Sequence, residues 1–416
     1  MADIKPFKGY IPNPEHAKNV ASLPYDVLST AEGKKLVENN PISYLRVEKS
    51  DVDFHHDIDP HSEIVHNKGR ENLHKLIEDG VLIGGKAPVF YVYRQKMGNL
   101  VQTGLVAGAS VDEYNKGIIK KHELTRKDKE DDRTHHVDRV GANTGPVFLA
   151  YPQNKNMDAV INDVTSKIPD IDFAADDGVV HTLWVIDNQA TIDKIVELFK
   201  KIPTLYIADG HHRSAAASRV QAIRQARNPN HTGNESYNYF LSVIFADNQL
   251  NIMDYNRVVK DLHGMTSENF IIKLRGKFDV KEFKVSLPED AKPRHRGEFT
   301  MYLDGKWYRL KAKASIIPKN DPVKSLDVSV LQDNVLSPLL GIDDPRTNKR
   351  IDFVGGIRGM KELVKRCNED CKVAFAVYPT GMDQLMSIAD AGEIMPPKST
   401  WFEPKLRSGM ITRMLD

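Results

Sequence analysis

The strongest limit on the fold comes from the segment "PTLYIADGHHRS", where an apolar run stops at a glycine and polar residues follow at once. The run from Pro203 to Gly210 is typical of a buried strand. The next stretch, "SAAASRVQAIRQAR", places Ala216, Val220 and Ile223 on one face at helical spacing. Because glycine permits a tight turn and a close backbone approach, the sequence predicts a strand–turn–helix corner here.

The polar residues of this corner predict a phosphate-binding site. The first N–H groups of a helix lack intrahelical partners, and the helix dipole favours an anion beside them. Arg213 offers a bidentate fork for phosphate oxygens, and Asp209 could hold Mg²⁺ or orient a histidine. The alternative is an ordinary turn with Asp209 as an N-cap and solvated histidines. A zinc site is not expected, because adjacent histidines rarely converge on one ion and no cysteine or third histidine lies at a familiar spacing.

The remainder of the chain mixes strands and helices without strict βαβ alternation, which predicts an α+β (mixed α/β) fold. The clearest hairpin is "FTMYLDGKWYRLKA", with Asp-Gly at its turn, and "APVFYVYRQK" with "NLVQTGLVAG" forms another strand pair. A length of 416 residues suggests two or three domains. The composition changes most near residues 256–266, so we predict domains at 1–260 and 261–416.

Charge and composition exclude several classes of protein. The 58 basic and 57 acidic residues give a net charge of +1, so no nucleic-acid partner is expected. The two cysteines, Cys367 and Cys371, imply no disulfide framework. No apolar run reaches membrane-spanning length and the N-terminal segment is polar, which predicts a soluble, cytoplasmic protein without a membrane partner.

The stretch "ADGHHRSAAA" resembles the signature of the ParB/sulfiredoxin-like fold, and its closest match is the "DGHHR" of free L-serine kinases. Sulfiredoxins carry a cysteine in the corresponding motif, and ParB proteins have a different Gly-Glu-Arg-Arg corner. With "PYDV" near its start and "KHELT" before the corner, the chain is similar to an uncharacterised conserved prokaryotic family. The resemblance implies a nucleotide-binding core with an N-terminal elaboration and a C-terminal α/β domain that closes on the substrate.

The same resemblance implies roles for individual residues. In the kinases, a His-Glu dipeptide upstream of the corner supplies the carboxylate that accepts the hydroxyl proton, and here "KHELT" contains His122 and Glu123. The segment "PPKSTWFEP" is similar to the closing segment of the kinases. The implied catalytic residues are Glu123, Asp209 and His212. The implied phosphate- or nucleotide-binding residues are Gly210, His211, His212, Arg213 and Ser214, and the implied substrate-binding residues are His122, Lys398, Ser399 and Thr400.

Two further segments leave alternatives open. The charged stretch at residues 117–139 is typical of a solvated face, or it folds over the site as a lid that contributes Arg133 and His136. Tyr25 and Asp26 of "PYDV" either line the site or form a turn.

The resemblance implies phosphoryl transfer on free L-serine or O-phosphoserine in a cleft between two domains. Mg²⁺ is the expected metal, with Asp209 as its ligand, and ATP, ADP or pyrophosphate is the expected phosphate donor or acceptor. The direction stays open, because the same site serves a serine kinase or a phosphoserine phosphatase. A nucleotide-binding, ParB-like regulatory protein without serine turnover is the alternative function. The oligomeric state is not indicated.

Overall fold

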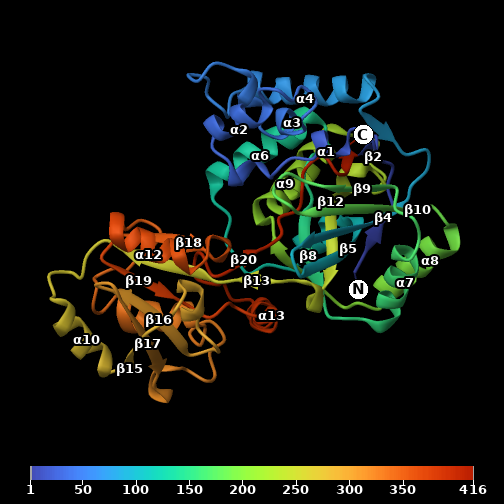
Figure 1. Cartoon of the computed structure of the whole chain (residues 1–416). Coiled ribbons are helices and arrows are strands. Elements are labelled where there is room, and N and C mark those ends of the chain that lie inside the picture. Colours follow the sequence, from blue (N-terminus) through green and yellow to red (C-terminus); the bar gives the residue numbers. More distant parts are fainter. Residues whose placement is uncertain (1, 416) are drawn as a thin grey trace. The chain divides into compact units, whose positions relative to one another are not determined.

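The computed structural model describes residues 2–415 and divides the chain into two compact units. Unit 1 comprises Met1–Leu250 and Pro404–Asp416, and unit 2 comprises Asn251–Glu403. The fold is a mixed α/β arrangement with several sheets, as the sequence predicted (Figure 1). The predicted boundary at 260/261 lies ten residues beyond the start of unit 2, and residues 404–416 belong to unit 1.

Unit 1 is built on a mixed nine-stranded sheet with the order β6-β11-β8-β12-β5-β4-β10-β9, in which β1 pairs with β5. The predicted pair β4–β5 is an antiparallel hairpin, whereas β11 runs parallel to β6 and antiparallel to β8. Burial explains the sequence of β11, since Leu205 and Ile207 are fully buried. The strands are β1 Ile4–Lys5, β4 Phe90–Met97, β5 Leu100–Ser110, β6 Ile119–Lys120, β8 Val147–Tyr151, β9 Ile171–Ala174, β10 Val180–Ile186, β11 Leu205–Asp209 and β12 Tyr239–Ala246.

Helices pack around this sheet. Helix α7 contacts β4 and β10, α8 contacts β1, α9 contacts β8 and β12, and α6 packs along α9. Among residues 2–415, no helix combines the length and apolar character needed to cross a bilayer. The helices of unit 1 are α1 Ala17–Val20, α2 Thr30–Val37, α3 Leu45–Glu48, α4 Glu63–Glu78, α5 Val111–Asn115, α6 Lys127–Val140, α7 Lys155–Thr165, α8 Gln189–Phe199 and α9 His211–Arg227.

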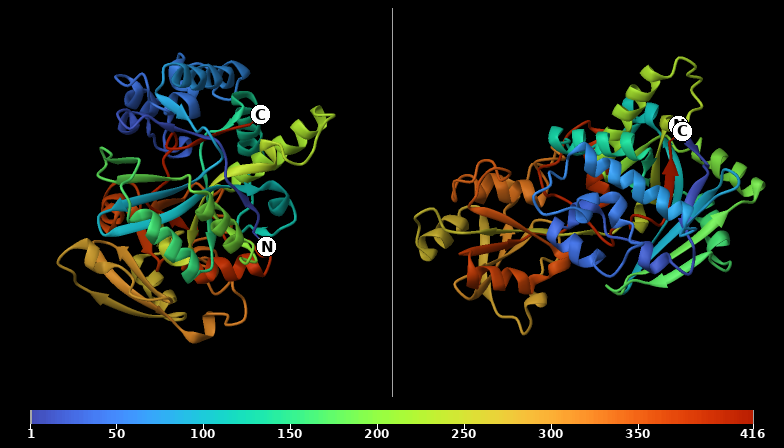
Figure 2. Two further views of the ribbon diagram at one scale, coloured as in Figure 1. Left: turned by 90° about the vertical axis from the view of Figure 1, so that its right-hand side faces the viewer. Right: turned by 90° about the horizontal axis from the view of Figure 1, so that it is seen from above.

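A second, four-stranded sheet of unit 1 joins distant parts of the chain in the order β3-β2-β21-β7. Its members are β2 Gly9–Pro12, β3 Leu82–Gly84, β7 Ala142–Asn143 and β21 Thr412–Met414. In both views of Figure 2 the red C-terminal segment runs among the blue N-terminal elements, in agreement with the antiparallel pairing of β2 and β21. The C-terminal segment is therefore a structural part of unit 1.

Unit 2 contains a six-stranded antiparallel sheet with the order β15-β17-β16-β19-β14-β18, and a two-stranded sheet of β13 and β20. The predicted Asp-Gly hairpin is β16–β17. The strands are β13 Ile252–Met253, β14 Tyr255–Val259, β15 Phe278–Phe283, β16 Glu298–Leu303, β17 Lys306–Ala312, β18 Ile351–Gly355, β19 Val373–Ala376 and β20 Trp401–Phe402. The helices are α10 Ser267–Arg275, α11 Asp327–Leu331, α12 Met360–Glu369 and α13 Met382–Asp390.

Candidate functional site

The predicted strand–turn–helix corner is present in unit 1. Strand β11 ends at Asp209, Gly210 follows with φ 95°, and α9 begins at His211. This φ lies in the left-handed region, which favours glycine. Because Gly210 provides no side-chain cap, the first-turn amides of the 17-residue helix are left for another partner.

Asp209 is an ionised carboxylate held by two donors. One oxygen accepts the Gly210 N–H at 2.8 Å, and the other lies 2.7 Å from Nζ of Lys405. Burial alone would raise the pKa of Asp209, but Lys405 and the Gly210 amide outweigh it and lower this pKa to about 2. Lys405 belongs to the C-terminal segment of unit 1. The sequence did not indicate Lys405, because the resemblance pointed to Lys398, seven residues earlier, as the substrate-binding lysine.

Both histidines of the motif hold the loop that connects β6 to α6. Nε2 of His211 accepts the backbone N–H of His122 at 3.4 Å, and Nε2 of His212 accepts that of Arg126 at 3.0 Å. Burial lowers the pKa of both imidazoles below the ordinary value, so both rings are neutral at pH 7. A neutral ring whose Nε2 accepts a hydrogen bond carries its own hydrogen on Nδ1. The two rings therefore fix the loop on either side of Glu123.

Glu123 lies at the corner, although 88 residues separate it from His211. Its Oε2 is 3.9 Å from Nδ1 of His211, and its side chain is 56% exposed. His122 is 2% exposed, and its ring packs edge-on against that of His211 with 4.5 Å between centroids. Burial lowers the pKa of His122 to about 4. The structure thus brings His122 and Glu123 together with Asp209, Gly210, His211 and His212.

Arg213 points to a partner that the sequence did not reveal. Its guanidinium donates to both oxygens of Glu48, at 3.2 and 3.1 Å. Glu48 is 2% exposed and also accepts hydrogen bonds from Thr144 at 2.7 Å and Ser408 at 2.9 Å. Burial opposes ionisation of Glu48, but Arg213 and the other donors lower its pKa. A Cβ on Gly145 would overlap the Arg213 guanidinium, which explains the glycine in "NTGP".

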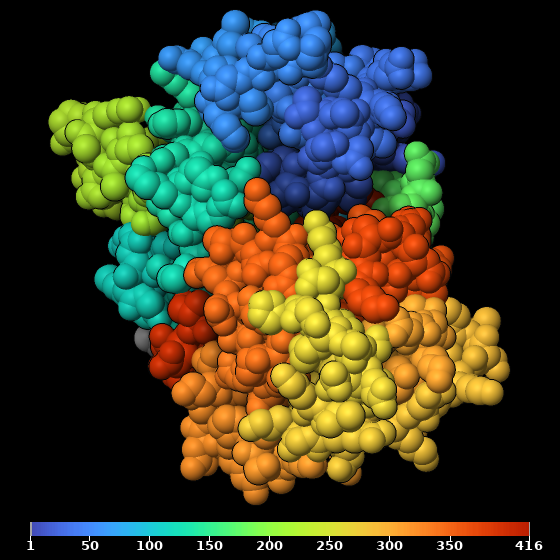
Figure 3. Space-filling model, turned by 90° about the vertical axis from the view of Figure 1, so that its left-hand side faces the viewer, coloured from blue at the N-terminus to red at the C-terminus, as the bar shows by residue number. Residues whose placement is uncertain are grey.

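The second half of the charged 117–139 stretch belongs to helix α6, whose inner face is buried while Lys127, Asp128 and His135 are exposed. In Figure 3 the teal residues of this region lie against the blue N-terminal helices, in agreement with the packing of α6 on α4. Arg133 is 8% exposed, donates to Asp132 at 2.8 Å and lies 3.9 Å from the ring centre of Tyr25. His136 is also buried and lies 3.2 Å from the Thr144 hydroxyl. The two candidate lid residues therefore belong to the packed interior of unit 1.

Tyr25 and Ser214, two further residues singled out from the sequence, are also packed inside unit 1. Tyr25 of "PYDV" packs against Arg133 and Arg213, and burial raises its pKa to about 12. The Ser214 side chain is fully buried and its hydroxyl donates to the Gly210 carbonyl at 3.2 Å, inside the helix. Beside Glu48 and Arg213 lies a cavity of about 20 Å³, which is room for roughly one water molecule.

Lys398, Ser399 and Thr400 belong to unit 2. Lys398 has φ 58°, and its carbonyl accepts a hydrogen bond from the buried Arg257 at 3.1 Å. The hydroxyl of Ser399 donates to the Pro396 carbonyl at 2.6 Å. These contacts fix the backbone of a tight turn on which the Lys398 side chain is exposed.

Comparison with solved structures returns distant similarities. A conserved hypothetical protein from Pyrococcus furiosus is 15% identical with a TM-score of 0.33, over 73% of this chain and 93% of that one. A free serine kinase in complex with AMP is 13% identical with a TM-score of 0.32, over 71% and 86%. C-terminally truncated SbnI from Staphylococcus aureus is 10% identical with a TM-score of 0.36, over 74% and 81%.

Comparison of the sequence with protein families, unlike the distant structural similarities, identifies the family of the chain. No curated protein matches the chain significantly. The sequence profile of a family described as "Protein of unknown function (DUF1015)" matches residues 4–329, which include the β6–α6 loop, the corner with its "DGHHR" motif and more than half of the chain. The chain therefore belongs to the DUF1015 family.

Proposed function

We propose that the protein transfers a phosphoryl group to or from the hydroxyl of free serine, as a serine kinase or as the corresponding phosphoserine phosphatase. The observation that carries the proposal is the position of Glu123, whose carboxylate lies 3.9 Å from His211 at the N-terminus of α9. A general base, an anion-binding helix terminus and a lysine are the groups that phosphoryl transfer requires. All three belong to unit 1.

In the kinase direction, Glu123 accepts the proton of the serine hydroxyl while the serine oxygen attacks the transferred phosphorus. A new O–P bond forms, the bond to the leaving phosphate oxygen breaks, and the leaving group keeps that electron pair. His211 and His212 do not exchange protons in this scheme. They position Glu123 by holding the amides of His122 and Arg126.

The phosphate groups of the donor are bound by the uncapped amides at the start of α9 and by Lys405. In this arrangement Arg213 supports the corner through Glu48. Asp209 fits a Mg²⁺ ligand, because it is ionised and its side chain is 42% exposed. Mg²⁺ would bind there in place of the Lys405 ammonium and would supply charge neutralisation at the phosphates.

The proposal also includes a substrate-binding segment in unit 2 and a ParB/sulfiredoxin-like core in unit 1. Lys398 and Thr400 of unit 2 offer one cation and one hydroxyl to the carboxylate or phosphate of the substrate, whereas Ser399 would have to release its bond to Pro396 to take part. A ParB/sulfiredoxin-like core in unit 1 accounts for the strand–glycine–helix corner.

The test is turnover followed by phosphorus NMR. The protein is incubated with Mg²⁺ and serine plus ATP, ADP or pyrophosphate, and separately with O-phosphoserine alone or with ADP. Replacement of Glu123 with Gln is expected to lower kcat by about 10²- to 10⁴-fold, since it removes the base. Asp128→Asn is the matched control, because Asp128 is an exposed carboxylate nearby that pairs with Arg126.

Equal activity of the wild-type and Glu123→Gln proteins would remove the base from the scheme. Nucleotide binding without turnover of serine or phosphoserine under any condition would refute the proposal and support a regulatory role.

A further inference from the structure

The α9 corner also gathers ligand atoms of the kind that transition metals bind. One ring nitrogen each of His122 and His211 and one carboxylate oxygen of Glu123 lie within 4.8 Å of one another. We propose that these three residues form a binding site for a divalent transition metal of the Zn²⁺ class. The sequence did not predict it, because the adjacent pair His211 and His212 do not share an ion. The partner of His211 is instead His122, from another element.

His122 has the environment of a metal ligand. It is 2% exposed, and within residues 2–415 no hydrogen-bond partner reaches its Nδ1. Its other ring nitrogen donates to the Ile207 carbonyl, so the lone pair is on Nδ1. Ligating histidines are commonly oriented by such a bond to a backbone carbonyl. A buried nitrogen without a partner is costly, and a bound ion satisfies it.

His211 and Glu123 complete the set after the ligand atoms draw closer. Around a tetrahedral Zn²⁺, ligand atoms lie about 3.3 Å apart, so the 3.9 Å between Nδ1 of His211 and Oε2 of Glu123 must shorten by roughly half an ångström, and the pairs with His122, which lie within 4.8 Å, must also shorten. The Glu123 side chain is 56% exposed, so an ion can reach it from solvent. Ligation through Nδ1 places the ring hydrogen on Nε2, which gives up the long 3.4 Å bond from the His122 amide.

The chemistry of these donors selects the class of ion. Two imidazoles and one carboxylate suit Zn²⁺ and other first-row ions, whereas Mg²⁺ prefers oxygen ligands and retains its waters. The Asp209 carboxylate acts electrostatically on both rings and favours a cation beside them.

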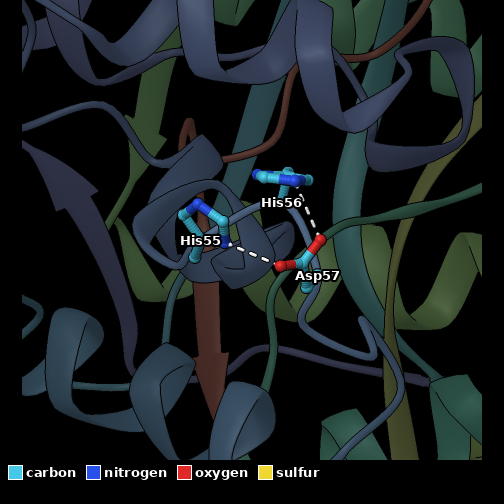
Figure 4. A group of neighbouring side chains, drawn as sticks. All are labelled: His55, His56 and Asp57. Carbon is cyan, nitrogen blue, oxygen red and sulfur yellow. Dashed lines mark hydrogen bonds and ion pairs between the residues drawn. The ribbon is translucent and has the colours of Figure 1, made fainter.

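A second, exposed group of possible metal ligands, His55, His56 and Asp57, could also bind Zn²⁺ and would add to the binding signal. Neighbouring rings of His55 and His56 each face one oxygen of Asp57, at 3.1 and 2.8 Å (Figure 4). All three side chains are more than 70% exposed and adjacent in sequence. An ion bound there would be a surface ion, so the double variant His55→Ala/His56→Ala is the starting protein.

The experiment is a calorimetric titration of this variant with Zn²⁺, and with Mg²⁺ alone for comparison. One Zn²⁺ per chain is expected. Adding His122→Asn or Glu123→Gln is expected to raise Kd by at least about 100-fold. Adding His74→Asn is the control and is expected to leave Kd within about threefold, since His74 is an exposed histidine of α4 outside the three ligands. Mg²⁺ is expected to bind more weakly than Zn²⁺, and His122→Asn is expected to leave its binding unchanged, since the proposed Mg²⁺ ligand Asp209 is outside the three Zn²⁺ ligands.

The proposal is overturned if the starting variant binds no stoichiometric Zn²⁺, if Mg²⁺ binds as tightly, or if His122→Asn binds as well as its parent. Should His122→Asn fail to fold, the exposed Glu123→Gln carries the test with circular dichroism as its control. The metal site and the proposed reaction both use the Glu123 carboxylate, so turnover is measured on Zn²⁺-free protein. A protein that turns over serine in this form and binds no Zn²⁺ when titrated refutes the site alone, and one that binds Zn²⁺ but shows no turnover in its Zn²⁺-free form refutes the reaction alone.

Discussion

Replacement of Glu48 with Gln tests whether the buried pair with Arg213 holds unit 1 together. The carboxylate accepts two hydrogen bonds from Arg213 and one each from Thr144 and Ser408, and the residue is 2% exposed. Glutamine keeps the shape but leaves the Arg213 cation without its counter-charge. Breaking one partner of a buried pair costs about 3–5 kcal/mol of unfolding free energy. We expect a loss in this range.

The matched experiment removes both charges. Arg213→Met alone leaves the Glu48 anion buried and is expected to cost a similar amount, whereas the double variant leaves no unpaired charge. The loss of unfolding free energy in the double variant should therefore be roughly 2–3 kcal/mol smaller than the sum of the two single losses. Guanidinium unfolding followed by tryptophan fluorescence measures this. A background of Trp307→Phe and Trp401→Phe leaves Trp184 of β10, which reports on unit 1.

Strict additivity would refute the reasoning, since it would mean that the two charges do not interact in the folded protein. A single-variant loss below about 1 kcal/mol would have the same meaning, because that is the range of exposed ion pairs.

Two further perturbations follow from the same unit. Gly145→Ala is expected to lower the free energy of unfolding by about 3 kcal/mol, because the added Cβ overlaps the Arg213 guanidinium. The loss should be smaller in an Arg213→Ala background, and unfolding midpoints measure both values. Burial lowers the pKa of His122 to about 4 and of His181 to about 3. The unfolded chain therefore binds more protons below pH 6.5, and stability should fall by roughly 4 kcal/mol between pH 8 and pH 5. Denaturation midpoints that do not change over this interval would contradict the assignment of these rings as neutral.

The local parts of the fold were predictable from sequence. The strand–glycine–helix corner follows from the apolar run before Gly210 and the small residues after it, and the hairpin β16–β17 follows from its Asp-Gly turn. These features depend on residues close together in the chain, where periodicity and turn chemistry carry the information. The position of Glu123 beside the corner was an expectation drawn from the resemblance, and no local pattern indicated it.

The long-range partners were not predictable. Glu48 and Arg213 are 165 residues apart, and Asp209 and Lys405 are 196 apart, so no spacing relates them. The highly charged stretch at residues 117–139 left open whether it forms a solvated face or a lid, and neither alternative predicted a half-buried helix. The buried face of α6 carries charged side chains that form ion pairs with one another, such as Asp132 with Arg133. A search for apolar periodicity does not detect a buried face made of paired charges.

The return of residues 404–416 to unit 1 has a consequence for the synthesis of the protein. These residues follow all of unit 2 in the chain, yet they supply Lys405, Ser408 and strand β21. On the ribosome, unit 2 is complete and free to fold while unit 1 still lacks a strand and the lysine of its corner. A chain that terminates before residue 405 consequently lacks the lysine that pairs with Asp209 in the candidate site.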